Sequence, residues 1–69
     1  MRTVDRSPSI ADLSVVSLRH AHECEGRVLP EGAKGTVVYT YRGGAGYEVE
    51  FERPFHCVAT VGRDDIRPA

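Results

Sequence analysis

Hydrophobic and polar residues alternate most strictly between residues 47 and 52. Aromatic or aliphatic side chains occupy every second position of this segment, and glutamates occupy the positions between them. Successive side chains of a β-strand point to opposite faces of a sheet, so this period of two predicts a half-buried strand. We expect the apolar set to face the core and the acidic set to face solvent: Tyr47, Val49 and Phe51 inside, Glu48, Glu50 and Glu52 outside.

Three further segments, residues 13–19, 35–41 and 55–61, are rich in β-branched and apolar residues and are predicted to be strands. The register of residues 35–41 is not evident from the pattern. Residues 42–46 and Arg53-Pro54 provide turns between strands. Residues 64–66 predict a single 3₁₀ turn that brings Ile66 to the core. The inward positions predict one core: Val16, Leu18, Val49, Phe51, Cys57, Ala59 and Ile66.

The order of these elements predicts an all-β fold. Residues 20–34 show no helical periodicity and contain Gly26, Pro30 and Gly32, so we expect a long loop after the first strand, of a kind that often carries function. A chain of 69 residues has room for one core. Closing the sheet would remove exposed strand edges. We therefore expect a five-stranded SH3-like barrel over residues 12–69, preceded by a flexible arm of residues 1–11.

Charge and composition exclude some classes of protein. Nine basic and ten acidic residues give a net charge of −1, which argues against a dedicated nucleic-acid binder. No stretch approaches the roughly 20 apolar residues of a membrane helix. The first residues lack the apolar core of a signal peptide, so we expect a cytoplasmic protein in which Cys24 and Cys57 are free thiols.

Several runs of this sequence resemble one bacterial family. They are the Gly-Thr-Val-Val run of residues 35–38, the Tyr-Glu-Val-Glu-Phe run of residues 47–51, and the ending Asp-Asp-Ile-Arg-Pro of residues 64–68. On these runs, residues 13–68 resemble the DUF4926 family of small bacterial proteins of unknown function. The resemblance implies an SH3-like fold and no particular activity. The connection at residues 52–54 is shorter than the Asp-Gly-containing turn common in that family.

Residues 32–37, Gly-Ala-Lys-Gly-Thr-Val, also resemble the KOW motif of ribosomal and transcription-factor barrels. That resemblance implies a nucleic-acid-binding domain, in which Arg27, Lys34 and Arg42 would contact the phosphates. Glycines that enter a strand also serve backbone geometry, whatever the domain binds. We therefore keep nucleic-acid binding as the alternative function and favour a structural role for these glycines.

Histidines and cysteines offer two kinds of chemistry. His20, His22 and Cys24 alternate along the chain, and imidazole and thiolate are ligands that suit zinc. A fourth ligand would have to come from His56, Cys57 or water, so we expect no metal and no cofactor. A Cys–His nucleophilic pair is a second option. A chain this small is not expected to enclose a substrate pocket of about 300 Å³ or more, so we do not expect an enzyme.

Aromatic and acidic side chains point to the function that we favour. If Tyr39 or Tyr41 points outward beside the long loop, the pair would form an aromatic groove of the kind that SH3-like domains present to extended peptides. The glutamates of residues 48–52 are either a solvated face or a surface for a basic partner. We predict a non-catalytic protein–protein interaction module. Its predicted partner-binding residues are Tyr39, Tyr41, Arg27, Lys34 and Arg42.

Self-association is a further expectation. A short chain hides little of its apolar surface, and pairing two copies would cover more of it. A two-fold dimer is the commonest arrangement of identical chains. We expect a homodimer in which Tyr39, Tyr41 and Val58 form the contact.

Overall fold

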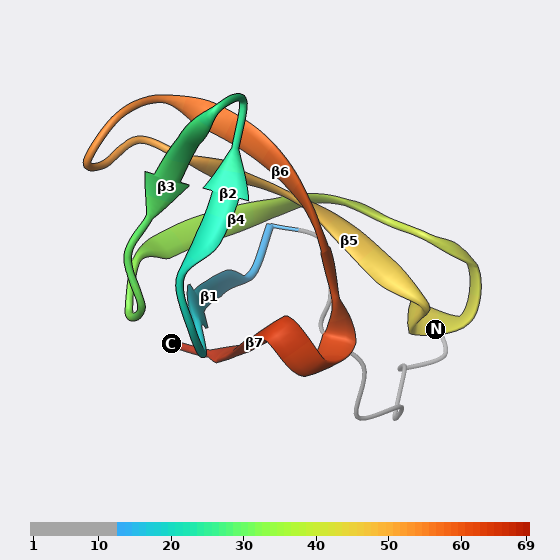
Figure 1. Cartoon of the computed structure of the whole chain (residues 1–69). Helices are drawn as coiled ribbons and strands as arrows, with labels where there is room; N and C mark the ends of the chain where they lie inside the picture. The colour runs from blue at the N-terminus through green and yellow to red at the C-terminus, as the bar shows by residue number, and fades with distance from the viewer. Residues whose placement is uncertain (1–12) are drawn as a thin grey trace.

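The computed structural model describes residues 13–69 as an all-β chain, as predicted (Figure 1). Its elements are β1 (Val15–Leu18), β2 (His22–Cys24), β3 (Arg27–Leu29), β4 (Lys34–Thr40), η1 (Arg42–Gly44), β5 (Gly46–Phe51), β6 (Cys57–Gly62), η2 (Arg63–Asp65) and β7 (Ile66–Pro68), where η marks a 3₁₀ turn. The flexible arm expected for residues 1–11 lies outside the described residues. None of the described residues belongs to a helix that could span a membrane.

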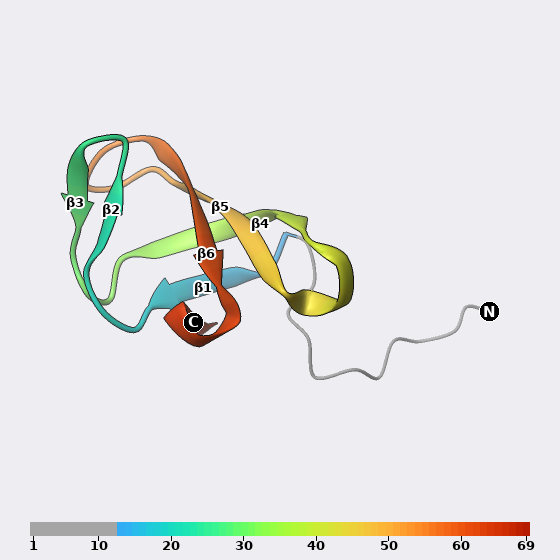
Figure 2. The same ribbon diagram turned by 45° about the vertical axis from the view of Figure 1, so that its right-hand side comes forward.

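Five strands form one antiparallel sheet in the order β6-β5-β4-β1-β7. After β6, the chain turns through η2 and returns to the outer side of β1 as β7 (Figures 1 and 2). The predicted number of strands in this sheet and the predicted 3₁₀ turn before the last strand are confirmed. No ladder joins β6 to β7 in the described part of the chain, so hydrogen bonding does not close the sheet into a barrel.

Residues 20–34 contain a β-hairpin, so the prediction of a long loop without structure of its own was wrong. Strand β2 pairs with β3, and Cys24 lies opposite Arg27. The two turn residues, Glu25 and Gly26, have φ angles of +55° and +81°. Positive φ at both central residues is the requirement of a tight two-residue hairpin turn. Glycine adopts a positive φ easily. Glutamate stands at the first position in place of the usual Asn or Asp, so the sequence indicates the turn only weakly.

One hydrophobic core joins the five-stranded sheet to this hairpin. All seven residues predicted to face inward are buried in it. The hairpin adds Cys24 and Leu29, and β4 adds Val37. The register of β4 shifts between Val37 and Tyr39, so Val37 is buried while the next two side chains are exposed. Such a bulge breaks the period of two, which explains why the pattern did not reveal the register.

Gly35 is required by the close approach of β4 to β5. A Cβ atom at this position would lie 2.6 Å from Cγ1 of Val49, 2.8 Å from the carbonyl oxygen of Glu50 and 2.9 Å from the ring of Phe51. These distances are too short for any side chain without movement of the backbone or core. The second glycine of the KOW-like run therefore has the structural explanation that we favoured.

Cys24 and Cys57 form a disulfide, so the prediction of two free thiols was wrong. Their Cα atoms are 6.5 Å apart, within the range that a disulfide spans. Both side chains are buried in the core, one from β2 and the other from the first residue of β6. The bond therefore ties the small hairpin to the main sheet.

Replacing Phe51 with alanine should lower the free energy of unfolding by about 3 to 5 kcal/mol, because the ring is fully buried and its removal leaves a cavity. Urea denaturation followed by circular dichroism measures this change. Tyr39→Ala removes an exposed ring from the neighbouring strand and should change the free energy by less than about 1 kcal/mol. Equal unfolding midpoints for Phe51→Ala and the parent would contradict the register of β5.

Reducing the disulfide should lower the free energy of unfolding by about 3 to 4 kcal/mol, because the bond closes a loop with a sequence separation of 33. Urea denaturation with and without reductant measures the difference. The double variant Cys24→Ala/Cys57→Ala is the control, and its midpoint should not respond to reductant. Two titratable thiols in the native protein without reductant would disprove the bond.

Candidate functional site

The outer surface of β4, β5 and β6 carries a continuous set of aromatic and acidic side chains. Paired residues of neighbouring strands share a face, and Tyr39 lies opposite Glu48, which lies opposite Thr60 on its other side. In the same way, Glu50 lies opposite Val58. We call this surface the acidic–aromatic face. It consists of Tyr39, Tyr41, Glu48, Glu50, Glu52, His56, Val58 and Thr60.

Two tyrosines and Glu48 form one end of the acidic–aromatic face. The rings of Tyr39 and Tyr41 meet edge to face, with centroids 5.0 Å apart and an interplanar angle of 77°. Both rings remain open to solvent, with exposed fractions of 53% and 39%. The hydroxyl of Tyr41 donates a hydrogen bond to Oε2 of Glu48, and Oγ1 of Thr60 donates to the same oxygen at 2.8 Å. These bonds hold the carboxylate beside the aromatic pair.

The hydrogen bond to Glu48 raises the pKa of Tyr41 above its ordinary value, and desolvation and the charge of Glu48 act in the same direction. An ionised tyrosine could not donate this bond and would lie against a carboxylate. The phenol of Tyr41 therefore stays neutral near pH 7. The negative charge at this end of the face belongs to Glu48.

Glu50, Glu52 and His56 form the other end of the face, beside the β5–β6 turn. Nε2 of His56 lies 2.7 Å from Oε2 of Glu50. This hydrogen bond raises the pKa of His56; the charges of Glu52, Glu50 and Glu25 add to the effect, and desolvation opposes it. The protonated imidazole is stabilised because it can donate to the Glu50 carboxylate.

No lysine or arginine of residues 13–69 forms an ion pair with the carboxylates of this surface. Between residues 13 and 69, the ion pairs with carboxylates are His20–Asp65 at 3.0 Å and His56–Glu50 at 2.7 Å. No lysine or arginine takes part in either pair. The acidic–aromatic face therefore presents negative charge to solvent.

The structure brings Tyr39 and Tyr41 together, and Arg42 directly follows Tyr41 in the chain, but Arg27 and Lys34 belong to other parts of the fold. The guanidinium of Arg27 lies 3.8 Å from the ring centroid of Phe55, in a cation–π contact. Lys34 begins β4, whereas Arg42 begins η1 beyond the other end of that strand. A strand of seven residues separates these two cations, about 20 Å at the usual rise per residue. The three cations therefore form no common surface.

The tyrosine pair also lies away from residues 20–34. The β2–β3 hairpin lies over one end of the sheet, and the β4–β5 connection, which follows Tyr39, lies at the other end (Figures 1 and 2). The expectation that the aromatic groove would adjoin the long loop was therefore wrong. The sequence alone could not place the loop, because its own hairpin and the disulfide direct it towards β6.

His20, His22 and Cys24 do not form a set of metal ligands. The sulfur of Cys24 is bonded to Cys57, and Nε2 of His20 lies 3.0 Å from Oδ1 of Asp65. Nδ1 of His22 donates to the carbonyl oxygen of Glu23 at 2.9 Å. The disulfide also removes both thiolates that a Cys–His nucleophilic pair would need.

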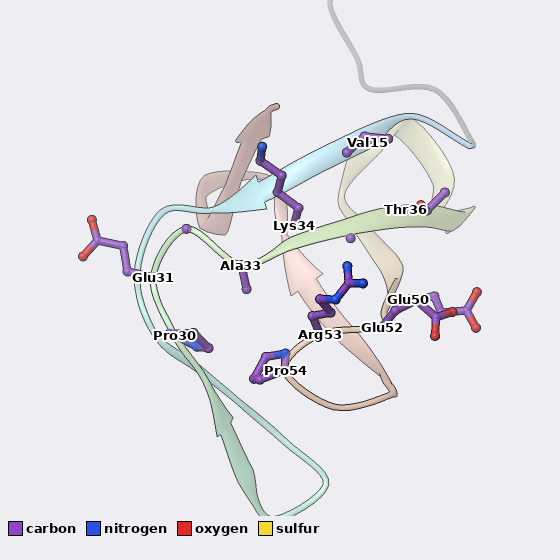
Figure 3. A pocket seen from close by; sticks show the side chains of 12 residues that line it. Val15, Pro30, Glu31, Ala33, Lys34, Thr36, Glu50, Glu52, Arg53 and Pro54 are labelled. Carbon is purple, nitrogen blue, oxygen red and sulfur yellow. The ribbon is translucent and has the colours of Figure 1, made fainter.

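A groove of about 680 Å³ lies between the β3–β4 connection and the β5–β6 turn (Figure 3). We did not expect a concave surface of this volume on so small a chain. Pro30 and Ala33 lie on one side of it, and Arg53 and Pro54 lie on the other. Most of its lining side chains are exposed. The lining contains neither a thiol nor an imidazole, and its polar side chains include Lys34, Thr36, Glu50 and Glu52.

Asp65 stabilises the turn that leads to the buried Ile66. Its Oδ2 accepts a hydrogen bond of 2.7 Å from the backbone N–H of Gly62, and Nε2 of His20 lies 3.0 Å from its Oδ1. The bond from Gly62 lowers the pKa of Asp65 below its ordinary value; desolvation opposes this effect and His20 adds to it. The ionised carboxylate is therefore the form that holds η2.

Acid should weaken the fold through Asp65. Its pKa is lower in the folded chain than the ordinary value of 3.8, so its contribution to stability is complete at pH values above 3.8. The contribution is lost as the pH falls through the lower pKa of the folded state. Urea denaturation between about pH 5 and about pH 2 should show a smaller loss of stability for Asp65→Asn than for the parent.

The matched control for this pH dependence is Asp64→Asn, because the adjacent and exposed Asp64 is not the acceptor of the Gly62 bond. This variant should follow the pH profile of the parent. Identical profiles for Asp65→Asn and the parent would show that the Gly62 bond does not contribute to acid sensitivity.

Comparison with known proteins does not extend this description of the site. No family model matches the chain, and no match to it was found among curated proteins or solved structures.

Proposed function

We propose that this protein is a non-catalytic interaction module whose acidic–aromatic face binds a positively charged segment of a partner protein. One observation carries the proposal. The exposed pair of Tyr39 and Tyr41 lies beside the carboxylate of Glu48, on a face whose glutamates have no lysine or arginine partner among residues 13–69. This surface offers π-electrons and negative charge together, and both attract cations.

Each component of the face contributes to recognition of a cationic side chain. A lysine or arginine over an exposed tyrosine ring gains about 0.5 to 1 kcal/mol from the cation–π interaction. The carboxylate of Glu48 adds charge complementarity, which selects basic partners and speeds their association. The hydrogen bonds from Tyr41 and Thr60 hold this carboxylate in place before binding, which reduces the entropy lost on binding.

The spacing of the glutamates favours an extended partner. Glu48, Glu50 and Glu52 occupy alternate positions of β5 and the residue that follows it, so they repeat about every 7 Å. Side chains on one side of an extended peptide repeat at the same interval. The proposed ligand is therefore an extended segment with lysine or arginine at alternate positions.

We propose further that the fold is SH3-like, as the resemblance to the DUF4926 family implies, with no ladder between β6 and β7 to close the sheet. The order of the strands, the 3₁₀ turn before the last strand and the pairing of β7 with β1 support this arrangement. Nucleic-acid binding of the KOW type has less support, because Arg27, Lys34 and Arg42 lie on separate parts of the molecule.

The proposal is tested with a synthetic peptide in which lysine and threonine alternate. Titration into ¹⁵N-labelled protein should shift the amide signals of Tyr39, Tyr41, Glu48 and Thr60. Glu48→Gln keeps an oxygen that accepts from Tyr41 and Thr60 but removes the charge, and it should weaken binding about threefold to tenfold. Glu23→Gln makes the same change on the exposed surface of β2 and should leave the affinity unchanged.

Four results would overturn the proposal. They are equal affinities of the Glu48→Gln and Glu23→Gln variants, equal binding of an acidic peptide of matched length, self-association that occupies the tyrosine pair, and binding of single-stranded RNA or DNA at Arg27, Lys34 and Arg42. The third result would support the homodimer, and the fourth would support the KOW-like alternative.

A further inference from the structure

Glu50, Glu52 and His56 combine the donor atoms of a metal site. One carboxylate oxygen from each glutamate and one ring nitrogen of His56 all lie within 4.8 Å of one another. In the part of the chain that the structure describes, no other group of His, Cys, Asp and Glu side chains comes together in this way. Imidazole nitrogen and carboxylate oxygen are both ligands of zinc and related divalent ions.

The backbone fixes where these three side chains begin. Glu50 lies in β5, where it pairs with Val58 of β6, and Glu52 follows two residues later. His56 immediately precedes Cys57, whose backbone is held by the ladder to β5 and by the disulfide to Cys24. The donors therefore come from the end of β5 and from the two ends of the β5–β6 connection.

The distances fit a metal ion after small rotations of the side chains. Zinc binds oxygen and nitrogen at about 2.0 to 2.2 Å, which places two ligands of a tetrahedral ion about 3.4 Å apart. The present limit of 4.8 Å is somewhat longer. The hydrogen-bonded pair of His56 and Glu50, at 2.7 Å, is somewhat shorter. Glu52 and His56 are exposed and can rotate, and Glu52 has no ion-pair partner among residues 13–69.

We propose that Glu50, Glu52 and His56 form a surface site for a divalent transition-metal ion. Two carboxylates balance the charge of the ion, and Glu25 adds negative charge near His56. Binding replaces the His56–Glu50 hydrogen bond with bonds from both residues to the metal, and any proton on Nε2 passes to water. Three protein ligands leave at least one coordination position for water or for a donor atom of a partner.

This site shares Glu50 and Glu52 with the row of glutamates proposed to align a cationic peptide, but each proposal also depends on residues that the other does not use. The peptide proposal depends on Tyr39, Tyr41 and Glu48, and the metal proposal depends on none of them. Glu48→Gln should therefore weaken peptide binding and leave metal affinity unchanged. A failure of one proposal is thus distinguishable from a failure of the other.

Zinc chloride is the probe, and the oxidised full chain is the protein to be tested. Isothermal titration calorimetry should show one zinc ion bound per chain, and the imidazole carbon–proton signals of His56 should shift on binding. His56→Ala should weaken zinc binding by at least about tenfold, since even the loss of a residue that only supports a ligand has effects of this size. Glu52→Gln should weaken it in the same direction.

His22→Ala is the matched control, because it removes a histidine on β2 that lies outside the cluster. Its zinc affinity should equal that of the parent. The proposal is wrong if millimolar zinc produces no binding, if His56→Ala binds as tightly as the parent, or if zinc shifts the ring signals of His20 or His22 in place of those of His56.

Discussion

The pleated backbone of β5 is the constraint on which the rest of the structure depends. Its side chains must alternate between two faces, so the register that buries Tyr47, Val49 and Phe51 places the half-buried Glu48 and Glu50 on the outer face. The strand is paired on both sides, with β4 and β6. A shift of one residue would place carboxylates in the core, which makes this register strongly preferred. The hydrophobic core and the acidic–aromatic face are therefore two results of one alternation.

A core of this size needs additional cover, and the β2–β3 hairpin provides it. Leu29 and Cys24 complete the buried cluster from the hairpin. Because the hairpin belongs to a separate two-stranded sheet, few backbone hydrogen bonds hold it to the main sheet. The Cys24–Cys57 bond supplies the covalent connection. It also orders the beginning of β6, next to His56 and the acidic cluster.

The acidic–aromatic face has two ends with different chemistry. At one end, a neutral tyrosine hydroxyl and a threonine hold a carboxylate beside exposed rings, an arrangement that suits an organic cation. At the other end, an imidazole and two carboxylates approach one another closely enough to share a metal ion. Both proposals follow from the same imbalance, since lysine and arginine do not pair with these acids within residues 13–69.

The sequence by itself determined the all-β class, the alternation of β5 and the seven inward positions, because these follow from local periodicity and composition. Only the tertiary structure decided the disulfide, since Cys24 and Cys57 are 33 residues apart and meet because separate elements share one core. The same is true of the hairpin and the β4 bulge, where a glutamate with positive φ and one extra residue depart from the usual patterns. The cluster of Glu50, Glu52 and His56 also escaped the sequence pattern, because it depends on how the β5–β6 turn returns the chain across the sheet.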